Sequence, residues 1–578
     1  MKAVIGICSQ LQSGTPAPVL ERLLSSTLTP LLQDMYRDGG ICVSMTLSGF
    51  EMEWIEAAHP EINVLINILA RRGQIDFLST SFNGLALQLL PSAERAAEVE
   101  KTTTFIRRRY SRRPSGYWSY SQVWSPSSLS TIKLCTLDYA VISTSSASDD
   151  RLRGRKNPFV MSELGKSIIV IPTNDEISKL VSESRSIRRP TEVLCQLVQK
   201  ARIERDAPLD YVMLNIDQLN YEQCNGYDVI MSAFERLRSR KLSASALDLS
   251  ELRAEVLEGG YLAPGIYGYD FTPSHPSVNE IVLSNPTQRG FFRILNRYWQ
   301  YLKAWNADKS LKNEVASAIV RGMGAVDYLY PSEFARRNTM GKTLGEIDRL
   351  LETRSLRLPA LIDLDDDGYD ELIMQGEIFT AVFDTKGGGI DCFFNNLGLP
   401  DFRLPVQIPV FSDRIYGQEK GEIALNRQRF TMETDEKTYS TVTFSSGVLK
   451  KAGLDISVSK SFCFEGGSLN MEFTITNNAD KPCGLRYEVL MPLRCKALSP
   501  VGTKAKTARF SIPDSDGEFT ISVKAESKEF ALDLLRSEKK GASVADSGKE
   551  DYNDGYRLQW DLKIASGSVF EQRLSFSC

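Results

Sequence analysis

The sequence predicts an α/β domain followed by an all-β domain, because its hydrophobic pattern changes twice along 578 residues. Over residues 1–288, short apolar runs alternate with amphipathic segments, which is typical of repeated β-loop-α units around a parallel sheet. Residues 289–356 keep a helical period with few Gly or Pro, which predicts a short helical bundle. Residues 357–578 alternate with period two between turn residues, which predicts a C-terminal antiparallel β-sandwich.

The first region contains enough β-loop-α units to favour a barrel over one small Rossmann unit. The predicted strands are short apolar runs, and they are Ala3–Cys8, Cys42–Leu47, Ile75–Thr80, Gly116–Val123, Tyr139–Ser143, Ser167–Ile171 and Tyr211–Ile216. The predicted helices lie between the earlier strands, and they are Val19–Arg37, Glu53–Arg72, Ala93–Tyr110 and Ser127–Leu134. In such barrels the functional residues follow the carboxyl ends of the strands.

The charge and composition of the chain limit the kinds of partner that it is expected to bind. The formal net charge is −4, which provides no general attraction to nucleic acid or to an anionic membrane. The apolar runs have strand length and are far too short to span a bilayer. Ten cysteines occur without CxxC spacing, as expected of reduced thiols in a cytoplasm, and only two histidines occur, which argues against a histidine-based zinc site.

Residues 116–126 read GYWSYSQVWSP and resemble the nucleophile motif of glycoside hydrolase family 57, the α-amylase and 4-α-glucanotransferase family. The glycine, both tryptophans, the valine and the proline keep the family's spacing, but Ser121 stands where that motif carries its catalytic Glu. A retaining glycosidase uses one carboxylate as nucleophile and a second as acid/base, about 5 Å apart. Because a Ser with no adjacent base is a poor nucleophile, the substitution argues against the family's chemistry.

Four further stretches resemble the same family in the right order, namely Leu47–Ile55, Arg72–Asp76, Gly290–Arg293 and Asp363–Glu371. The resemblance implies an incomplete (β/α)7-type barrel over 1–288, a helical region over 289–356 and, over 357–578, the β-sandwich domain of the 4-α-glucanotransferase branch. It also implies an α-glucan or maltooligosaccharide as partner and suggests a homo-oligomer.

The family's other polar positions are mostly lost. The stretch Gly6–Gly14 lacks the family's His, although Gln10 remains as a candidate sugar contact. Gly84 stands where the family has a Glu. Asp217 follows an apolar strand and is the one candidate remnant of the acid/base, with a helix N-cap as its structural alternative.

Phe82 and Trp124 are candidates for a flat aromatic surface on which sugar rings stack. We expect Trp124 to be exposed on the loop after its strand, whereas Trp118 belongs to the core. The alternative for all three is ordinary core packing, because aromatic side chains mostly bury area.

Asp363, Asp365, Asp367 and Glu371 place oxygen ligands at alternating positions around a glycine, as at the start of a calcium loop. The twelfth position is Met374, so the segment is not an EF-hand. A shorter structural calcium loop and a solvated acidic turn both stay open, and the sequence predicts no other cofactor.

These observations predict a glycan-binding or regulatory pseudoenzyme related to α-glucan metabolism, located in the cytoplasm. The first alternative is an active, diverged α-amylase or 4-α-glucanotransferase that uses an unidentified carboxylate. The second is a protein–protein scaffold without a sugar site. Neither nucleic acid nor a membrane is expected as a partner.

Overall fold

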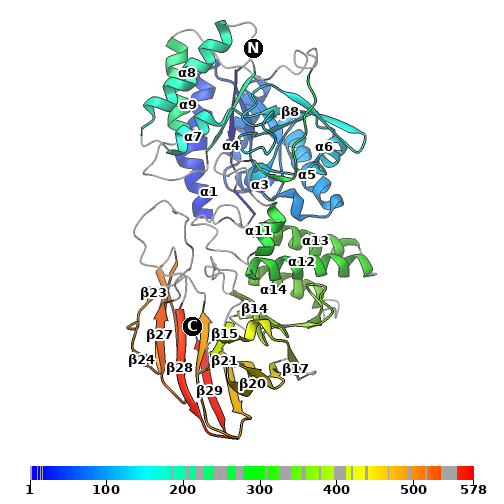
Figure 1. The fold of residues 1–578 in the computed structure, drawn as a ribbon. Coiled ribbons are helices and arrows are strands. Elements are labelled where there is room, and N and C mark those ends of the chain that lie inside the picture. The colour runs from blue at the N-terminus through cyan, green and yellow to red at the C-terminus, as the bar shows by residue number, and fades with distance from the viewer. Residues whose placement is uncertain are drawn as a thin grey trace. The chain divides into compact units, whose positions relative to one another are not determined.

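The structure is a computed structural model, drawn in Figure 1. It describes residues 3–9, 11–13, 15, 17–183, 186–203, 209–216, 226–239, 247, 257–267, 277–284, 286–305, 309–324, 340–352, 360–375, 379–395, 412–417, 421–435, 440–465, 468–491, 496–514, 517–534 and 556–577. The chain divides into two compact units, Met1–Ile281 and Val282–Cys578. The predicted helical region therefore groups with the C-terminal β-strands.

The first unit is built on one eight-stranded sheet in the order β7-β8-β6-β4-β3-β2-β1-β9. Its strands are β1 (Ala3–Cys8), β2 (Val43–Thr46), β3 (Ile75–Ser79), β4 (Gly116–Trp118), β6 (Tyr139–Ile142), β7 (Phe159–Glu163), β8 (Lys166–Pro172) and β9 (Asp210–Asn215). Every neighbouring pair is parallel except β7 with β8. One isolated parallel bridge, between Thr173 and Tyr211, links the end of β8 to β9.

Helices surround this sheet in Figure 1. They are α1 (Ala17–Leu23), a π-helical turn (Leu24–Leu28), α2 (Thr29–Arg37), α3 (Gly49–Ala58), α4 (Pro60–Arg71), α5 (Ser92–Tyr110), α6 (Ser128–Leu134), α7 (Asp175–Glu183), α8 (Arg188–Ile203) and α9 (Gly226–Ser239). The single helix predicted over Glu53–Arg72 is wrong, because Pro60 begins a new helix after His59. The new start at Pro60 fits the preference of proline for the first turn of a helix.

The strand predicted over Gly116–Val123 is also wrong in its second half. Strand β4 ends at Trp118, and the chain then makes a 3-10 turn over Tyr120–Gln122. The following short strand β5 (Val123–Trp124) leaves the main sheet and pairs antiparallel with β10 (Gly265–Ile266). Side chains after Trp118 therefore do not follow the alternation of a continuous strand.

One face of the main sheet carries a hydrophobic core drawn from most of its parallel strands. The core includes Leu78 of β3, Trp118 of β4, Tyr139 of β6 and Tyr211 of β9. Because side chains alternate along a strand, residues two positions further on continue this same face toward the carboxyl ends. The polar residues that follow these strands are thereby brought to one edge of the sheet.

The second unit holds α12 (Pro286–Ala304), α13 (Lys309–Gly324) and α14 (Met340–Glu352), while α11 (Val278–Ser284) crosses the boundary. Its strands form antiparallel sheets in the orders β11-β12-β13-β14, β16-β15-β22-β28-β27-β24 and β17-β18-β20-β21-β29-β26-β25-β23, with β19 paired to β20. The strands of the four-stranded sheet are β11 (Leu361–Ile362), β12 (Glu371–Gln375), β13 (Phe379–Asp384) and β14 (Gly389–Asn395).

The remaining strands are β15 (Ser412–Tyr416), β16 (Glu422–Ala424), β17 (Phe430–Thr434), β18 (Thr441–Ser446), β19 (Leu449–Lys451), β20 (Leu454–Glu465), β21 (Ser468–Asn477), β22 (Cys483–Met491), β23 (Lys496–Ala497), β24 (Lys504–Ala505), β25 (Thr507–Asp514), β26 (Gly517–Ala525), β27 (Phe530–Leu534), β28 (Tyr556–Ile564) and β29 (Val569–Ser577). Residues from all three sheets share one hydrophobic core.

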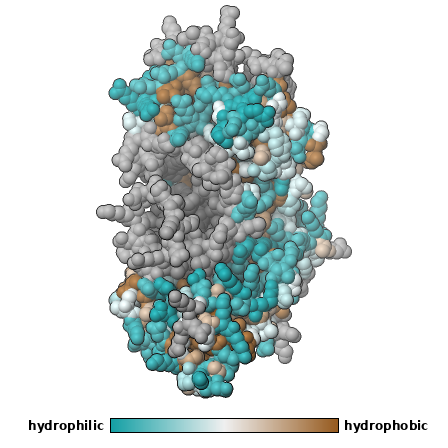
Figure 2. All heavy atoms as spheres, in the orientation of Figure 1, coloured by the Kyte–Doolittle hydropathy of each residue, from teal (hydrophilic) through white to brown (hydrophobic). Residues whose placement is uncertain are grey.

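On the face drawn in Figure 2, the coloured surface is mostly hydrophilic, and hydrophobic residues lie in small separate patches. Scattered apolar side chains of this kind are ordinary for a protein surface. Among the described helices, none is both long and apolar enough to cross a membrane.

Candidate functional site

The loop after β4 holds the position at which the resemblance expects a nucleophile. Ser121 is 2% exposed, and its backbone has a positive φ of 48°. Gln122 follows with a φ of 56°, so two consecutive non-glycine residues are left-handed. Such backbone is costly and tends to persist at functional sites. The loop thus has a strained shape, and it presents a serine where the resemblance expects a carboxylate.

Gln122 connects this loop to the ends of neighbouring strands. Its side-chain Oε1 accepts a hydrogen bond from the backbone N–H of Ser143 at 2.5 Å, directly after β6. Its carbonyl accepts from the N–H of Tyr267 at 3.0 Å. The loop after β4 is therefore held from two sides by residues distant in sequence.

A carboxylate that the sequence analysis missed lies at the same edge of the sheet. Asp175, at the start of α7, accepts hydrogen bonds from the hydroxyls of Ser143, Ser145 and Thr173, the last at 2.5 Å. Burial raises the pKa of Asp175, and the three hydroxyl donors oppose that rise. The signal that was available is its place, four residues after Ile171, where the predicted strand ends.

The loop after β3 is fixed from beneath by Glu98 of α5. The Glu98 carboxylate accepts from the hydroxyl of Ser81 at 3.1 Å and from the backbone and side-chain N–H groups of Asn83, both at 2.8 Å. Burial raises the pKa of Glu98, and its hydrogen bonds to Asn83 and Ser81 act in the opposite direction. Glu98 thus orders this loop.

The loop after β1 lies across the loops after β3 and β4. The N–H of Ser13 donates to the carbonyl of Asn83 at 2.9 Å, and the side chain of Gln12 donates to the hydroxyl of Tyr120 at 2.9 Å. Gly84 has a φ of 63°, and a Cβ atom there would lie 2.5 Å from the carbonyl oxygen of Leu11. Backbone therefore fills the space beside Gly84 that a larger side chain would need.

The expectation that Trp124 is exposed on the loop after its strand is wrong. Trp124 is only 1% exposed, because its strand pairs with β10 and its ring belongs to a core cluster with Leu262 and Tyr267. Phe82 is also buried: the Nζ of Lys101 lies 3.6 Å from its ring centre, and the ring packs against Gly49. A sugar contact by either residue stays a prediction.

The remaining predicted sugar-site residues, Gln10 and Asp217, lie outside the described residues. Ser121 and Asp175 belong to the described part of the sheet edge. Trp118 lies in the core as expected, at 5% exposure.

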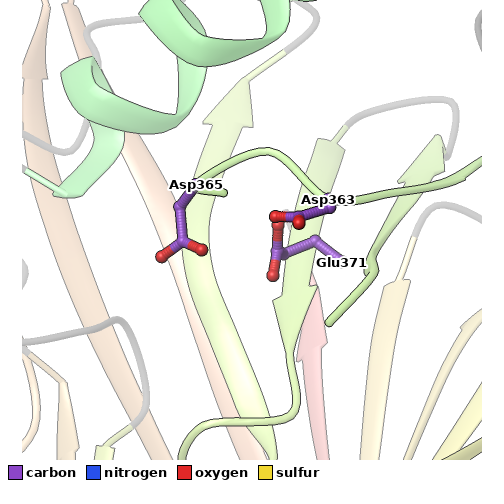
Figure 3. A group of neighbouring side chains, drawn as sticks. All are labelled: Asp363, Asp365 and Glu371. Atoms are coloured by element: carbon purple, nitrogen blue, oxygen red, sulfur yellow. The ribbon is translucent and has the colours of Figure 1, made fainter. Parts of the chain in front are cut away.

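The acidic loop of the second unit brings three of its four predicted ligands together. Carboxylate oxygens of Asp363, Asp365 and Glu371 all lie within 4.8 Å of one another. Figure 3 shows Asp363 and Glu371 close together, with Asp365 across from them. Asp367 lies outside this group and forms an ion pair with Arg429 at 2.8 Å.

The chemistry of this group fits a calcium ion. Oxygen ligands of this kind are those that calcium prefers. Glu371 is buried, and burial together with the neighbouring acids Asp384, Asp365 and Asp367 raises its pKa to about 8. A bound cation would offset this crowding of negative charge, which Arg293 meets in part through its ion pair with Asp365 at 3.5 Å.

Comparison with known proteins identifies relatives of the first unit. Residues 18–186 match the family model described as glycosyl hydrolase family 57. Alpha-amylase 1 of Dictyoglomus thermophilum is 25% identical over 179 residues, which cover 31% of this chain and 26% of that protein. The 4-alpha-glucanotransferase of Thermococcus kodakarensis is 24% identical over 184 residues, which cover 31% of this chain and 27% of the relative. These alignments span about a quarter of each relative's length.

A solved structure shares the fold over the whole chain. The 4-alpha-glucanotransferase from Thermococcus litoralis superposes with a TM-score of 0.68 at 16% identity, covering 100% of this chain and 99% of that one. At this identity the likeness concerns the fold alone. The family model, the curated relatives and the shared fold together support the assignment of this chain to glycosyl hydrolase family 57, with the family model covering residues 18–186.

Proposed function

We propose that this chain is an α-glucan-related protein of the family 57 type that binds glycan without double-displacement chemistry. The observation that carries the proposal is Ser121, a buried hydroxyl at the position of the family's nucleophile. A serine hydroxyl is a weak nucleophile at neutral pH and cannot replace the carboxylate of a double displacement. The ligand would be a maltooligosaccharide, because the curated relatives are an alpha-amylase and a 4-alpha-glucanotransferase.

The architecture that goes with this function is an incomplete (β/α)7-type barrel, a short helical bundle and a C-terminal antiparallel β-sandwich. The seven parallel strands of the main sheet and the bridge between Thr173 and Tyr211 support the barrel. A calcium ion held by Asp363, Asp365 and Glu371 would stabilise the loop that precedes β12. The proposed location is the cytoplasm, where thiols stay reduced, because the ten cysteines of the sequence lack CxxC spacing.

The test is isothermal titration of maltoheptaose into the purified protein. We expect saturable binding heat that ends with each injection, because binding occurs without turnover. A sustained heat flow, confirmed by new oligosaccharide lengths in product chromatography, would instead support the active-enzyme alternative.

The variant Ser121→Glu, with Ser121→Gln as its uncharged control of equal size, asks whether the rest of a catalytic site survives. We expect neither variant to form products, because among the described residues we assign no second carboxylate as acid/base beside Ser121. Product formation by Ser121→Glu alone would contradict this expectation.

The active-enzyme alternative is favoured by one observation, the carboxylate of Asp175 at the carboxyl edge of the sheet. If the protein turns over maltoheptaose, Asp175→Asn should abolish products. The scaffold alternative has no supporting contact in the described residues and predicts a flat titration with a stable protein partner in a pull-down.

A further inference from the structure

The carboxyl-terminal ends of four helices gather at the amino edge of the main sheet. Helices α2, α4, α5 and α6 each lead into the next parallel strand of this sheet, namely β2, β3, β4 and β6. Because a helix between parallel strands runs back along the sheet, each of these helices ends where its strand begins. This edge is the opposite one from the carboxyl edge at which Ser121 and Asp175 lie.

Hydrogen bonds from arginine side chains connect these helix ends in order along the edge. Arg72, which follows α4, donates to the carbonyl of Tyr36 in α2 at 3.1 Å. Arg112, which follows α5, donates to a carbonyl in the last turn of α4 at 2.8 Å. The next residue, Arg113, donates to the hydroxyl of Thr136 just beyond α6. The four helix ends therefore form one continuous surface.

Six exposed arginines lie on this surface, and we call them the basic rim. They are Arg71, Arg72, Arg107, Arg108, Arg112 and Arg113. Within the described part of the chain, none of the six forms an ion pair. By contrast, the neighbouring Arg37 pairs with Asp34, and Arg109 pairs with Glu56.

The positive charge of the basic rim exceeds what the helix ends require. A cation near a helix C-terminus is favoured by the macrodipole, but each helix end carries only about half a negative charge. The ends of α4 and α5 therefore offset about one of the six arginines. Asp38, Asp76 and Asp138 lie along the same edge, and they are fewer than the arginines. The formal net charge of −4 describes the whole chain and conceals this local excess.

Two exposed apolar side chains flank the basic rim. Tyr36, in the last turn of α2, is 45% exposed, and the guanidinium carbon of Arg72 lies 4.3 Å from its ring centre. Leu134, at the end of α6, is 68% exposed and follows the further cation Lys133. Exposed cations beside aromatic and aliphatic side chains are typical of a surface that lies on an anionic membrane.

The same features favour a membrane over a nucleic acid. Single-stranded nucleic acid is held by bases that stack on open aromatic rings, and Arg72 covers one face of Tyr36. An exposed leucine such as Leu134 adds nothing to contacts with a phosphate backbone, but it gains by entering the interfacial layer of a bilayer.

We propose that the basic rim binds the anionic phospholipid headgroups of a membrane surface. The forked N–H groups of the guanidinium groups bind lipid phosphates, and Tyr36 and Leu134 enter the interfacial layer. The carboxyl edge of the sheet is then directed away from the bilayer. The inference does not depend on the proposed sugar binding, because the two sites lie at opposite edges of the sheet.

The experiment measures co-sedimentation of the full chain with lipid vesicles. One set of vesicles contains phosphatidylcholine alone, and the other contains equal parts of phosphatidylcholine and phosphatidylglycerol. We expect binding to the second set only, and loss of that binding in about 1 M salt, where the screening length falls to about 3 Å. Equal binding to both sets, or no binding to either, would overturn the proposal.

The double variant Arg107→Gln with Arg108→Gln removes two cations of the basic rim. We expect its affinity for the anionic vesicles to fall about tenfold or more. The control is the double variant Arg151→Gln with Arg188→Gln, which has the same net charge but loses two exposed arginines that already pair with carboxylates. The control should bind vesicles as wild type does. Equal loss of affinity in both double variants would show that only net charge matters and would overturn the proposal.

Leu134→Ser tests the apolar part of the surface without changing the charge. We expect it to weaken vesicle binding about threefold, because less apolar area enters the bilayer. Since Leu134 and the two arginines are exposed, these variants should melt at the wild-type temperature without vesicles. Wild-type vesicle binding in both Leu134→Ser and the Arg107/Arg108 variant would overturn the proposal.

Two further measurements separate this inference from its alternatives. A labelled single-stranded RNA that binds more tightly than the vesicles, and less tightly to the Arg107/Arg108 variant, would overturn the membrane proposal and assign the basic rim to nucleic acid. Titration with maltoheptaose should give the same result for that variant and for wild type. Failure of vesicle binding would therefore leave the proposed sugar binding intact, and failure of sugar binding would leave the membrane proposal intact.

Discussion

The carbonyl oxygen of Leu11 lies so close to Gly84 that a Cβ atom on Gly84 would approach it to 2.5 Å. The backbone of Gly84 also has a φ of 63°, a conformation that L side chains rarely adopt. The glycine at this place is therefore required by the backbone beside it. The glycine at the position where the resemblance expects a Glu and the path of the loop after β1 are therefore linked.

Gly84→Ala should lower the stability of the first unit more than Gly73→Ala does. Gly73 has a φ of 75° with nothing within 4 Å of its Cβ position. Gly73→Ala therefore measures only the cost of placing a side chain on left-handed backbone, about 1 kcal/mol. Gly84→Ala adds a steric clash and should cost about 2 kcal/mol more. Urea unfolding followed by tryptophan fluorescence measures both. Equal losses of stability in the Gly84→Ala and Gly73→Ala variants would mean that the loop after β1 moves aside without cost.

Breaking the ion pair between Lys460 and Asp413 should strongly lower the stability of the second unit. The Nζ and Oδ1 atoms lie 2.7 Å apart, with side chains 4% and 3% exposed, and Tyr487 donates to the other Asp413 oxygen at 2.7 Å. Lys460→Met leaves a buried carboxylate without its cation and should cost about 3–5 kcal/mol.

The control for this prediction is Arg486→Met. Arg486 pairs with Asp561 at 3.1 Å, but both side chains are at least half exposed, so the loss should stay below about 1 kcal/mol. The double variant of Lys460→Met with Asp413→Leu should regain most of the stability, as measured by urea unfolding. A double variant as unstable as Lys460→Met alone would contradict the electrostatic explanation.

Asp76 should make the stability of the first unit depend on pH. Burial raises its pKa from 3.8 to about 6, and the charge of Arg112 opposes that rise. Because the folded state holds the proton more tightly than the unfolded state, the contribution is fully present below pH 3.8 and is lost as the pH rises through about 6.

Asp76→Asn should therefore be more stable than wild type at pH 8, by about 2 kcal/mol, and should lose this advantage near pH 4. Thermal unfolding across this pH range measures the difference. Asp150→Asn is the control, because that carboxylate is 87% exposed in its ion pair with Arg153. A pH-independent difference for Asp76→Asn would mean that its carboxyl is not the titrating group.

Calcium should raise the melting temperature of the second unit through Asp363, Asp365 and Glu371. A ligand that binds only the folded state stabilises it by about 2.7 kcal/mol at one hundred times its dissociation constant. Thermal unfolding with calcium chloride and then with a chelator tests this expectation.

Asp365→Asn should abolish the response to calcium, whereas Asp367→Asn should keep it. Asp367 lies outside the group of three and is engaged by Arg429. Loss of the response in both variants would place Asp367 among the ligands, and no response in wild type would leave the segment as a solvated acidic turn.

The parallel strands were predictable because each is a local apolar run. The predicted strand Ala3–Cys8 is β1 itself, and Tyr139–Ser143 differs from β6 by one residue. The hairpin strand β7 was not predicted, although it pairs with β8 along five residues. The local hydrophobic pattern does not predict a strand whose structure depends on pairing with a neighbouring strand.

The site was less predictable, because its contacts join residues far apart in the chain. Trp124 carries no local sign that Gly265 will pair with it. Asp175 gains its place from hydroxyls on two different strands, which no spacing in the sequence reveals. By contrast, Ser121 was recognisable from its motif alone, although its left-handed backbone was not.

The pairing of β5 with β10 also sets an order of events during synthesis. Trp124 emerges from the ribosome long before Gly265 and Ile266, so its core cluster lacks Leu262 and Tyr267 while the intervening chain is made. Closing so long a loop is slow, and until it closes an indole and the apolar residues around it are open to chaperones or to other nascent chains. The short strand β10 therefore completes the core of the first unit late in synthesis. We expect a chain cut before Gly265 to be prone to aggregate.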